Sequence, residues 1–376
     1  MEYSKLKEGI NEKSSVKKQH FELILTTSRD SVLSIYVTGT FNNWNVADPA
    51  YKMTPLGDGR YSLTLPEINQ KTIEYKYTLG DWNSAELDEY GNETRNRKAS
   101  ITSGQIKDSV KRWKNKGKIY KESLQPIIEL VDDAFFIPQL KKSRRVRVVL
   151  PHDYYVTTKS YPVIYMQDGQ NLFDHAAPFG NWGMDKRMAV LAESGKGDFI
   201  IVCIDHAESD RINEYNPYTH KTSKLGKGNG KLYVRFLAEI LKPFIDDEYR
   251  TLRDRDNTGV GGSSLGGLIS IYAGLMYPEV FGRLMIFSPS LWAAHNVHFD
   301  MINFFNPYYT KIYIYAGGKE GASMLPSVTK FKDGIEKRGM DDSKINVHLS
   351  IDPDGLHNEK RWGEEFPKSI DWLFFQ

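Results

Sequence analysis

The seven-residue stretch Gly261–Gly267 constrains this chain more than any other segment of its sequence. It contains the pattern Gly262-x-Ser264-x-Gly266, the spacing of a nucleophile elbow, in which a serine sits on a tight strand-to-helix turn with its hydroxyl exposed. Glycines on both sides let the strand and the helix approach closely, because they carry no Cβ atom. The pattern alone is weak, so the flanking sequence has to supply the strand and the helix.

The flanking residues predict both elements. Upstream, residues 258–262 are predicted to form a short buried strand. Downstream, four apolar residues recur at helical spacing: Leu268, Ile271, Tyr272 and Leu275. Pro278 then stops the predicted helix. The sequence therefore predicts an exposed nucleophile at Ser264, the alternative being a glycine-rich loop without chemistry.

Composition places the chain among ordinary globular proteins of about two domains. Its 376 residues are many for one domain, and 40% of them are hydrophobic and 26% charged. The net charge is +2 with acids and bases interspersed, so neither nucleic acid nor a membrane is expected as a partner. The single cysteine, Cys203, excludes an intrachain disulfide and a multi-cysteine metal site, and its apolar surroundings predict a buried thiol. The oligomeric state stays open.

The first residues predict the cellular compartment only on the condition that the chain starts at its native N-terminus. No apolar run approaches the about 20 residues that cross a bilayer. Residues 1–20 are polar and lysine-rich, without the apolar segment of a signal peptide. A cytoplasmic protein follows if this is the native start, and the inference fails if Met1 was added to a mature secreted chain.

The chain divides into regions that differ in their pattern of polar and apolar residues. After a polar segment over 1–18, residues 19–107 contain short alternating segments between turn clusters, which predicts a small antiparallel β-sandwich. Residues 108–126 are polar and predict a linker. In residues 127–376, strand patterns alternate with longer helical patterns, which predicts an α/β domain with a mostly parallel sheet flanked by helices.

A catalytic serine needs an imidazole that accepts its proton. In the chain order serine, acid, histidine, this base follows Ser264. His357 comes after the last predicted strand and before the terminal helix, where such a fold places its base. His348 falls inside a predicted strand, while His295 and His298 come too soon after the nucleophile.

The imidazole is best held by a carboxylate, and the acid should follow the strand predicted over 311–315. Glu320 stands at the carboxyl end of that strand and is the predicted acid. Asp352 and Asp354 compete, although they lie so close to His357 that they more naturally shape its turn. A serine–histidine dyad without a firm acid is the third alternative.

An oxyanion hole needs two backbone N–H groups, each contributing about 3 kcal/mol to lowering the barrier. One donor should be Leu265, directly after the nucleophile and at a helix N-terminus. The other should come from the loop after the strand predicted over 163–166, where Gly169 and Gln170 are the candidates. An ordinary turn at this loop is the alternative.

Four motifs resemble one esterase family, which contains enterochelin-type siderophore esterases, feruloyl and acetyl-xylan esterases, and S-formylglutathione hydrolases. They occupy residues 161–174, 262–267, 288–292 and 355–357, in the family's order. The resemblance covers about 127–376 and implies an α/β-hydrolase fold without metal or organic cofactor. By position it implies that Ser264 is the nucleophile, that His357 is the base, and that Leu265 and Gln170 form the oxyanion hole. The acid position corresponds to Glu320, where many relatives have aspartate.

Three further residues are candidates for substrate binding. Arg211 lies in a loop that resembles the loop after the family's third strand, and it could bind an acidic group of the substrate or pair with Glu214. Trp182 and Trp292 could form an aromatic wall for a phenolic or sugar moiety, or belong to the core.

The N-terminal region is similar to glycogen-binding and starch-binding immunoglobulin-like modules. The resemblance rests on residues 39–45 and 75–82, and by position it implies sugar contacts from Trp44, Lys76 and Trp82. Residues 83–88 lack the Asp-Pro turn that is common in sugar-binding members. A module that caps the substrate or only packs is the alternative to carbohydrate binding.

The sequence as a whole predicts a serine carboxylic-ester hydrolase that works through an acyl-enzyme. Acyl or feruloyl esters of carbohydrate are the expected substrates, and a siderophore trilactone is the alternative. Transfer of the acyl group to a sugar hydroxyl is a second class of reaction. A non-catalytic carbohydrate-binding scaffold is the third, and the intact Ser264, His357 and Glu320 argue against it.

Overall fold

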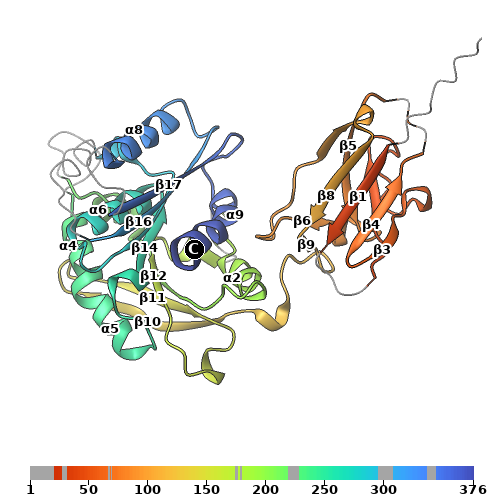
Figure 1. Cartoon of the computed structure of the whole chain (residues 1–376). Coiled ribbons are helices and arrows are strands. Elements are labelled where there is room, and N and C mark those ends of the chain that lie inside the picture. Colours follow the sequence, from red (N-terminus) through yellow and green to blue (C-terminus); the bar gives the residue numbers. More distant parts are fainter. Residues whose placement is uncertain are drawn as a thin grey trace, which may run out of the picture. The chain divides into compact units, whose positions relative to one another are not determined.

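A computed structural model describes residues 21–27, 32–66, 68, 70–173, 177, 180–218, 228–294, 308–336 and 344–376. The chain forms two compact units (Figure 1). The first consists of Met1–Glu89 and Glu93–Lys118, and the second of Tyr90–Asn92 and Ile119–Gln376. None of the described helices is long and apolar enough to cross a membrane.

The first unit is built from strands around its own apolar core. Its strands are β1 (Glu22–Thr27), β2 (Tyr36–Gly39), β3 (Thr54–Gly57), β4 (Arg60–Thr64), β5 (Thr72–Thr78), β6 (Glu86–Leu87), β7 (Arg97–Ser100), β8 (Gln105–Val110) and β9 (Arg112–Trp113). They form sheets of order β3-β4-β1-β8, β2-β5-β7 and β6-β9. In β5 the alternate residues Ile73, Tyr75 and Tyr77 are buried, as expected of a strand with one face on a core.

The predicted linker over 108–126 begins too early. Strand β8 continues to Val110 and pairs in parallel with β1, so this stretch belongs to the first unit, which ends at Lys118. Trp113 is buried there, and its Nε1 donates to Thr27 Oγ1 at 3.0 Å. Polar composition concealed these residues, because only alternate side chains of β8 face the core.

The second unit contains an eight-stranded sheet of order β10-β11-β13-β12-β14-β15-β16-β17. The strands are β10 (Ile127–Ile137), β11 (Lys142–Leu150), β12 (Val163–Met166), β13 (Ile200–Ile204), β14 (Thr258–Ser263), β15 (Arg283–Phe287), β16 (Thr310–Gly317) and β17 (Ile345–Asp352). The pairs from β13 to β17 are parallel, while β10 and β11 add an antiparallel edge. The predicted, mostly parallel sheet is therefore present. Its long edge strand, β10, was not predicted from the sequence.

Helices cover both faces of this sheet (Figure 1). They are α1 (Gln170–Phe173), α2 (Met184–Glu193), α3 (Arg211–Tyr215), α4 (Gly230–Phe236), α5 (Lys242–Glu248), α6 (Leu265–Met276), α8 (Met324–Glu336) and α9 (Glu359–Ile370). Successive residues of β12 enter different cores: Val163 and Tyr165 pack with α4 and α6, whereas Ile164 and Met166 pack with α2 and α9. Burial on both faces explains the continuous apolar runs of the central strands.

A three-residue segment of the chain, Tyr90–Asn92, belongs to the second unit. The Tyr90 hydroxyl donates to Asp371 Oδ2 at 3.0 Å, and Asn92 Nδ2 donates to the carbonyl of Glu364 at 3.0 Å. Arg187 of α2 donates to Asn92 Oδ1 at 2.7 Å. The segment is thus fixed to helices α2 and α9 by hydrogen bonds.

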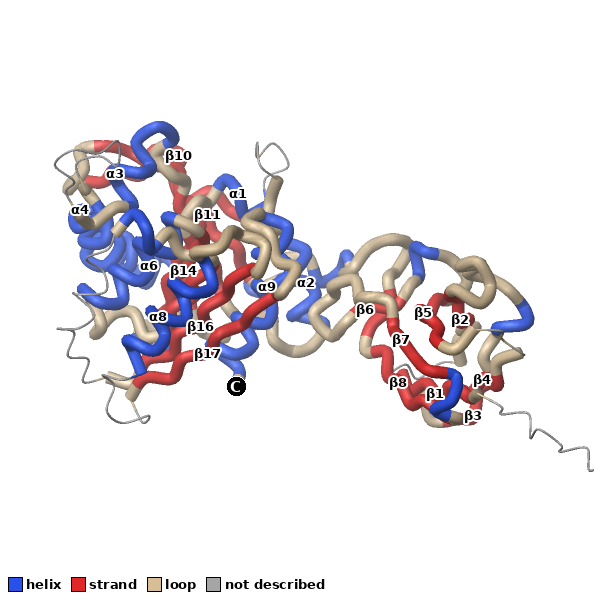
Figure 2. Tube along the Cα trace, turned by 90° about the horizontal axis from the view of Figure 1, so that it is seen from above, coloured by secondary structure: helices blue, strands red, loops and turns tan. Residues whose placement is uncertain are grey.

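Strands β14, β15, β16 and β17 are consecutive neighbours in the sheet and run in the same direction. Figure 2 labels β14, β16 and β17 in this part of the sheet. The loops that follow them therefore leave the sheet at one edge. Ligand sites of open α/β sheets lie at this carboxyl edge.

Candidate active site

Ser264 lies between β14 and α6 in strained backbone. Its φ of 56° and ψ of −119° are uncommon for a residue with a Cβ atom. A Cβ atom at Gly262 would lie 2.9 Å from the backbone of Gly266, so the turn needs glycine there. The predicted strand, tight turn and helix are all present, and the strain is what a nucleophile elbow requires.

His357 and Glu320 are joined at the carboxyl edge of the sheet. His357 Nδ1 and Glu320 Oε2 are 2.8 Å apart. Glu320 follows β16 and its side chain is fully buried, whereas His357 follows β17 and its side chain is 40% exposed. A buried carboxylate thus holds an imidazole that reaches solvent.

The two competing aspartates have other partners. Asp352 Oδ1 accepts from the backbone N–H of Asp354 at 3.0 Å, and Asp354 forms an ion pair with Lys319 at 2.7 Å. These contacts shape the turn before His357, as the sequence suggested. Glu320 is the acid that the structure brings to this histidine.

The hydroxyl of Ser264 has a serine partner. Its Oγ lies 3.0 Å from Ser290 Oγ, and either atom could be the donor. Within the described residues, no hydrogen bond joins Ser264 to His357. Catalytic hydrogen bonds are often long in ligand-free enzymes and tighten with substrate, so this geometry does not exclude a role for His357 beside Ser264.

The backbone N–H groups near Ser264 separate the two candidates for the second oxyanion donor. Gly169 N–H donates to the carbonyl of Ile204 at 2.8 Å and so does not supply an oxyanion hole. Gln170 opens α1 and Leu265 opens α6, and N–H groups of a first helical turn have no acceptor within their own helix. A Cβ atom at Gly266 would lie 2.9 Å from Asp168 Oδ2, which shows how closely this loop approaches the elbow.

Arg211 pairs with Asp168 rather than with Glu214. Its Nε donates to Asp168 Oδ1 at 2.6 Å and its Nη2 to Oδ2 at 2.8 Å. Glu214 instead accepts from Lys142 at 3.1 Å and from Arg144. The suggested pairing of Arg211 with Glu214 is therefore wrong, and a fork of two hydrogen bonds fixes the guanidinium beside the loop after β12.

The two tryptophans proposed as an aromatic wall differ in burial. Trp182 is 4% exposed and stacks on Phe287 with ring centroids 5.4 Å apart. It also packs against Trp362, so it is a core residue and does not wall a substrate. Trp292 is 59% exposed and remains accessible.

The three candidates in the first unit also differ. Trp44 and Trp82 lie with ring centroids 6.4 Å apart, and Trp82 is 45% exposed. Lys76 donates from Nζ to the carbonyl oxygen of Thr94 and, at 3.1 Å, to Thr94 Oγ1. The aromatic pair is thus together, while the Lys76 ammonium is already bound within its own unit.

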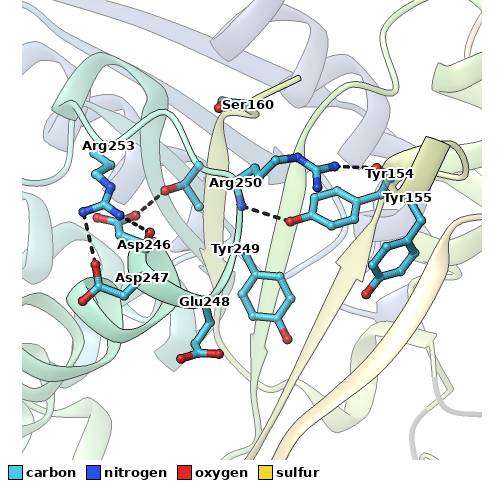
Figure 3. A pocket seen from close by; sticks show the side chains of 10 residues that line it. Tyr154, Tyr155, Ser160, Asp246, Asp247, Glu248, Tyr249, Arg250 and Arg253 are labelled. Atoms are coloured by element: carbon cyan, nitrogen blue, oxygen red, sulfur yellow. Dashed lines mark hydrogen bonds and ion pairs between the residues drawn. The ribbon is translucent and has the colours of Figure 1, made fainter. Parts of the chain in front are cut away.

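A cavity of about 470 Å³ lies elsewhere in the second unit (Figure 3). It is lined by residues around Ser160 and Thr251, which precede the parallel strands, so it lies at the edge opposite to Ser264. Some of its polar groups pair with one another: Thr251 Oγ1 donates to Asp246 Oδ1 at 2.7 Å, and Arg253 pairs with Asp247 at 3.1 Å. This cavity is not part of the site around His357.

The family model described as "Putative esterase" matches residues 137–373. The chain belongs to this family. It is an ester-hydrolysing enzyme, and the predicted serine ester hydrolase is confirmed at that level. The family and its structural neighbours also confirm the α/β-hydrolase-like fold of the second unit.

Three curated proteins are similar to parts of this esterase. The uncharacterised protein YbbA of Bacillus subtilis is 25% identical over 247 residues, which are 62% of this chain and 93% of YbbA. An α-amylase of Niallia circulans is 36% identical over 97 residues, 25% of this chain and 8% of the amylase. The iron(III) salmochelin esterase of Escherichia coli is 29% identical over 153 residues, 40% of this chain and 33% of that esterase.

The solved structure of an enterobactin esterase is similar to this chain over most of its length. The crystal structure of the enterobactin esterase FES from Shigella flexneri in the presence of enterobactin matches with a TM-score of 0.51 at 15% identity. The match covers 91% of this chain and 88% of FES. At this identity the likeness shows a common fold and nothing further.

Proposed function

We propose that Ser264, His357 and Glu320 form the catalytic triad of this esterase. The observation that carries the proposal is the hydrogen bond between His357 Nδ1 and the buried Glu320 carboxylate at the edge where the strained Ser264 emerges. All three residues follow parallel strands of one sheet. Sequence order, local strain and a buried carboxylate agree with the roles of nucleophile, base and acid.

In the proposed reaction, Ser264 Oγ attacks the ester carbonyl carbon and its proton moves to His357 Nε2. The tetrahedral intermediate collapses, and the leaving alkoxide takes the proton from the imidazolium. A water molecule then gives its proton to His357 and attacks the acyl-enzyme, which releases the carboxylic acid and regenerates the serine. Glu320 stabilises the imidazolium at each stage without becoming protonated.

The N–H groups of Leu265 and Gln170 are the proposed oxyanion donors. Both open a helix, and the elbow lies against the loop that carries Gln170. The side chain of Gln170 accepts from the backbone N–H of His206 at 3.0 Å, which fixes the start of α1. Donors held before the reaction cost no reorganisation when the oxyanion forms.

The triad is tested with p-nitrophenyl acetate and a fluorophosphonate probe. Ser264→Ala and His357→Ala should each remove nearly all turnover, and Ser264→Ala should abolish labelling, because the probe modifies an activated serine. Ser194→Ala, at the end of α2, is the matched control and should label like the wild type. Labelling that persists in a folded Ser264→Ala protein would overturn the assignment.

For the substrate, we propose acyl or feruloyl esters of carbohydrate. The first unit is proposed to be an immunoglobulin-like, carbohydrate-binding module in which Trp44 and Trp82 stack on sugar rings. The support is the partly exposed tryptophan pair and the stretch of similarity to an α-amylase. Trp292 and Arg211 are proposed as substrate contacts in the second unit. Affinity electrophoresis on glycogen, starch and xylan tests the module, with retardation expected for the wild type and lost in Trp82→Ala.

A siderophore trilactone is the second candidate substrate, because the salmochelin esterase aligns with 40% of the chain. A screen of methyl ferulate, acetylated xylan and a catecholate trilactone separates the two candidates. Turnover of the trilactone alone would replace the carbohydrate proposal. An added sugar acceptor in the same assay reveals acyl transfer, if an acylated sugar forms in place of the free acid.

A further inference from the structure

Two buried serines after β15 contact two members of the proposed triad. Ser288 Oγ donates to Glu320 Oε1 at 2.7 Å, and Ser290 Oγ lies 3.0 Å from Ser264 Oγ. Their exposed fractions are 0% and 3%. Pro289 alone separates them. This short turn therefore touches both the acid and the nucleophile.

The direction of the hydrogen bonds at Ser288 is determined by Trp362. An indole N–H is only a donor, and Trp362 Nε1 lies 3.0 Å from Ser288 Oγ, which must accept. The hydroxyl proton of Ser288 is then free to point at Glu320. Gly317 N–H also donates to Glu320 Oε1, at 2.7 Å.

Both donors act on the same oxygen of the Glu320 carboxylate. Oε1 is held by Ser288 and Gly317, which leaves Oε2 facing His357 Nδ1 at 2.8 Å. An ionised carboxylate only accepts hydrogen bonds. His357 must therefore carry its proton on Nδ1, and Nε2 is left as the acceptor that a general base needs.

We propose that Ser288 and Trp362 are positioning residues for ester hydrolysis. They form a chain of hydrogen bonds, Trp362 to Ser288 to Glu320, that fixes the plane of the carboxylate and through it the tautomer of His357. The proposal rests on the triad proposed above. Trp362 also packs edge-on against His357, with ring centroids 4.9 Å apart and an interplanar angle of 85°, so it limits the tilt of the imidazole as well.

The test is a double-mutant cycle on p-nitrophenyl acetate hydrolysis. Ser288→Ala removes the donor to Glu320, and Trp362→Phe removes the indole N–H while keeping an aromatic ring. Ser288→Ala should lower kcat about tenfold with little change in KM, the size of one lost hydrogen bond to a charged group. Trp362→Phe should lower kcat by up to the same factor, because it removes only the bond that orients Ser288. The double variant should be no slower than Ser288→Ala, because Trp362 acts through Ser288.

A spectroscopic signal separates positioning from general loss of packing. The downfield proton resonance of His357 Nδ1–H, identified by its absence in His357→Ala, should shift or broaden in Ser288→Ala and Trp362→Phe. Trp372→Phe is the matched control, since Trp372 packs in the same unit against Tyr313 and His348. In Trp372→Phe, the His357 Nδ1–H resonance and kcat should both match those of the wild type.

Three outcomes would overturn the proposal: unchanged kcat in both single variants, losses that multiply in the double variant, or an unshifted resonance. These outcomes are distinct from failure of the triad itself. If Ser264→Ala kept its turnover, the triad would fail. If Ser264→Ala were inactive while Ser288→Ala and Trp362→Phe behaved like the wild type, only the positioning inference would fail.

Discussion

Glu320 binds His357 from a position 37 residues earlier in the chain, with Oε2 and Nδ1 2.8 Å apart. The carboxylate is fully buried and accepts hydrogen bonds from Ser288 and Gly317 as well. These neutral donors compensate the buried charge. The imidazole in turn keeps 40% of its side-chain surface exposed, so substrate and water can reach it while its orientation stays fixed.

This arrangement predicts the effect of neutralising the acid. Glu320→Gln places an amide beside His357, and an amide N–H can pair with Nδ1 and force the proton onto Nε2. We expect kcat for p-nitrophenyl acetate to fall by up to about 10⁴-fold, the loss that a wrong imidazole tautomer causes in a serine triad. Asp352→Asn is the matched control and should keep most activity, because Asp352 accepts from the Asp354 N–H and pairs with Arg361, whereas Glu320 holds the imidazole.

A turnover like that of the wild type in folded Glu320→Gln would contradict this prediction and reassign the acid. A large loss in Asp352→Asn would do the same. Circular dichroism of each variant shows whether the fold is kept.

The strained conformation of Ser264 predicts a trade between activity and stability. A residue with a Cβ atom at φ 56° and ψ −119° carries strain that glycine avoids. The free energy of unfolding of the Ser264→Gly protein should therefore be about 1 kcal/mol higher than that of the Ser264→Ala protein, after the entropic cost of glycine is subtracted. Both proteins should be inactive. Urea unfolding followed by fluorescence measures the difference, and equal stabilities would show that the elbow stores no such strain.

Local pattern predicted the central strands of the second unit well. The strand expected over 311–315 lies within β16, and that expected over 163–166 is β12. Their side chains are buried on both faces, so each strand appears in the sequence as an uninterrupted apolar run. The edge strand β10 was not predicted, because one of its faces is exposed and acidic residues such as Asp132 and Asp133 interrupt its apolar pattern.

The sequence predicted a site residue only where a local pattern marks that residue by itself. Ser264, Glu320 and His357 each follow a recognisable strand, so chain order sufficed to select them. The hydrogen bond between Trp362 and Ser288 joins residues 74 positions apart, and no spacing rule predicts it. A family motif contained Ser288 and Ser290, yet their partners became visible only in the folded chain.

The environment of Cys203 predicts an inert thiol. Burial raises the pKa of Cys203 to about 12, so the reactive thiolate is scarce at neutral pH. The native protein should not react with Ellman's reagent at pH 8 in the time in which the urea-denatured protein reacts fully. Fast labelling of the native protein would mean that β13 opens locally.

Glu359, the first residue of α9, predicts a pH dependence of stability. It is 9% exposed, and burial raises the pKa of its carboxyl group. A carboxyl group whose pKa is higher in the folded than in the unfolded protein favours folding when protonated. Its contribution is therefore present at low pH and is lost as the pH rises through the pKa of the folded state.

Glu359→Gln should remove this dependence, because glutamine stays neutral. The melting temperature of the variant, relative to the wild type, should rise as the pH increases from about 4 to 7, across the ordinary range of a glutamate and above it. Glu248→Gln, at the exposed end of α5, provides a matched control whose difference from the wild type should stay nearly constant. A Glu359→Gln difference that is flat or falls with pH would show that ionised Glu359 is stabilised inside the fold, with the nearby Arg211 and His357 outweighing the cost of burial.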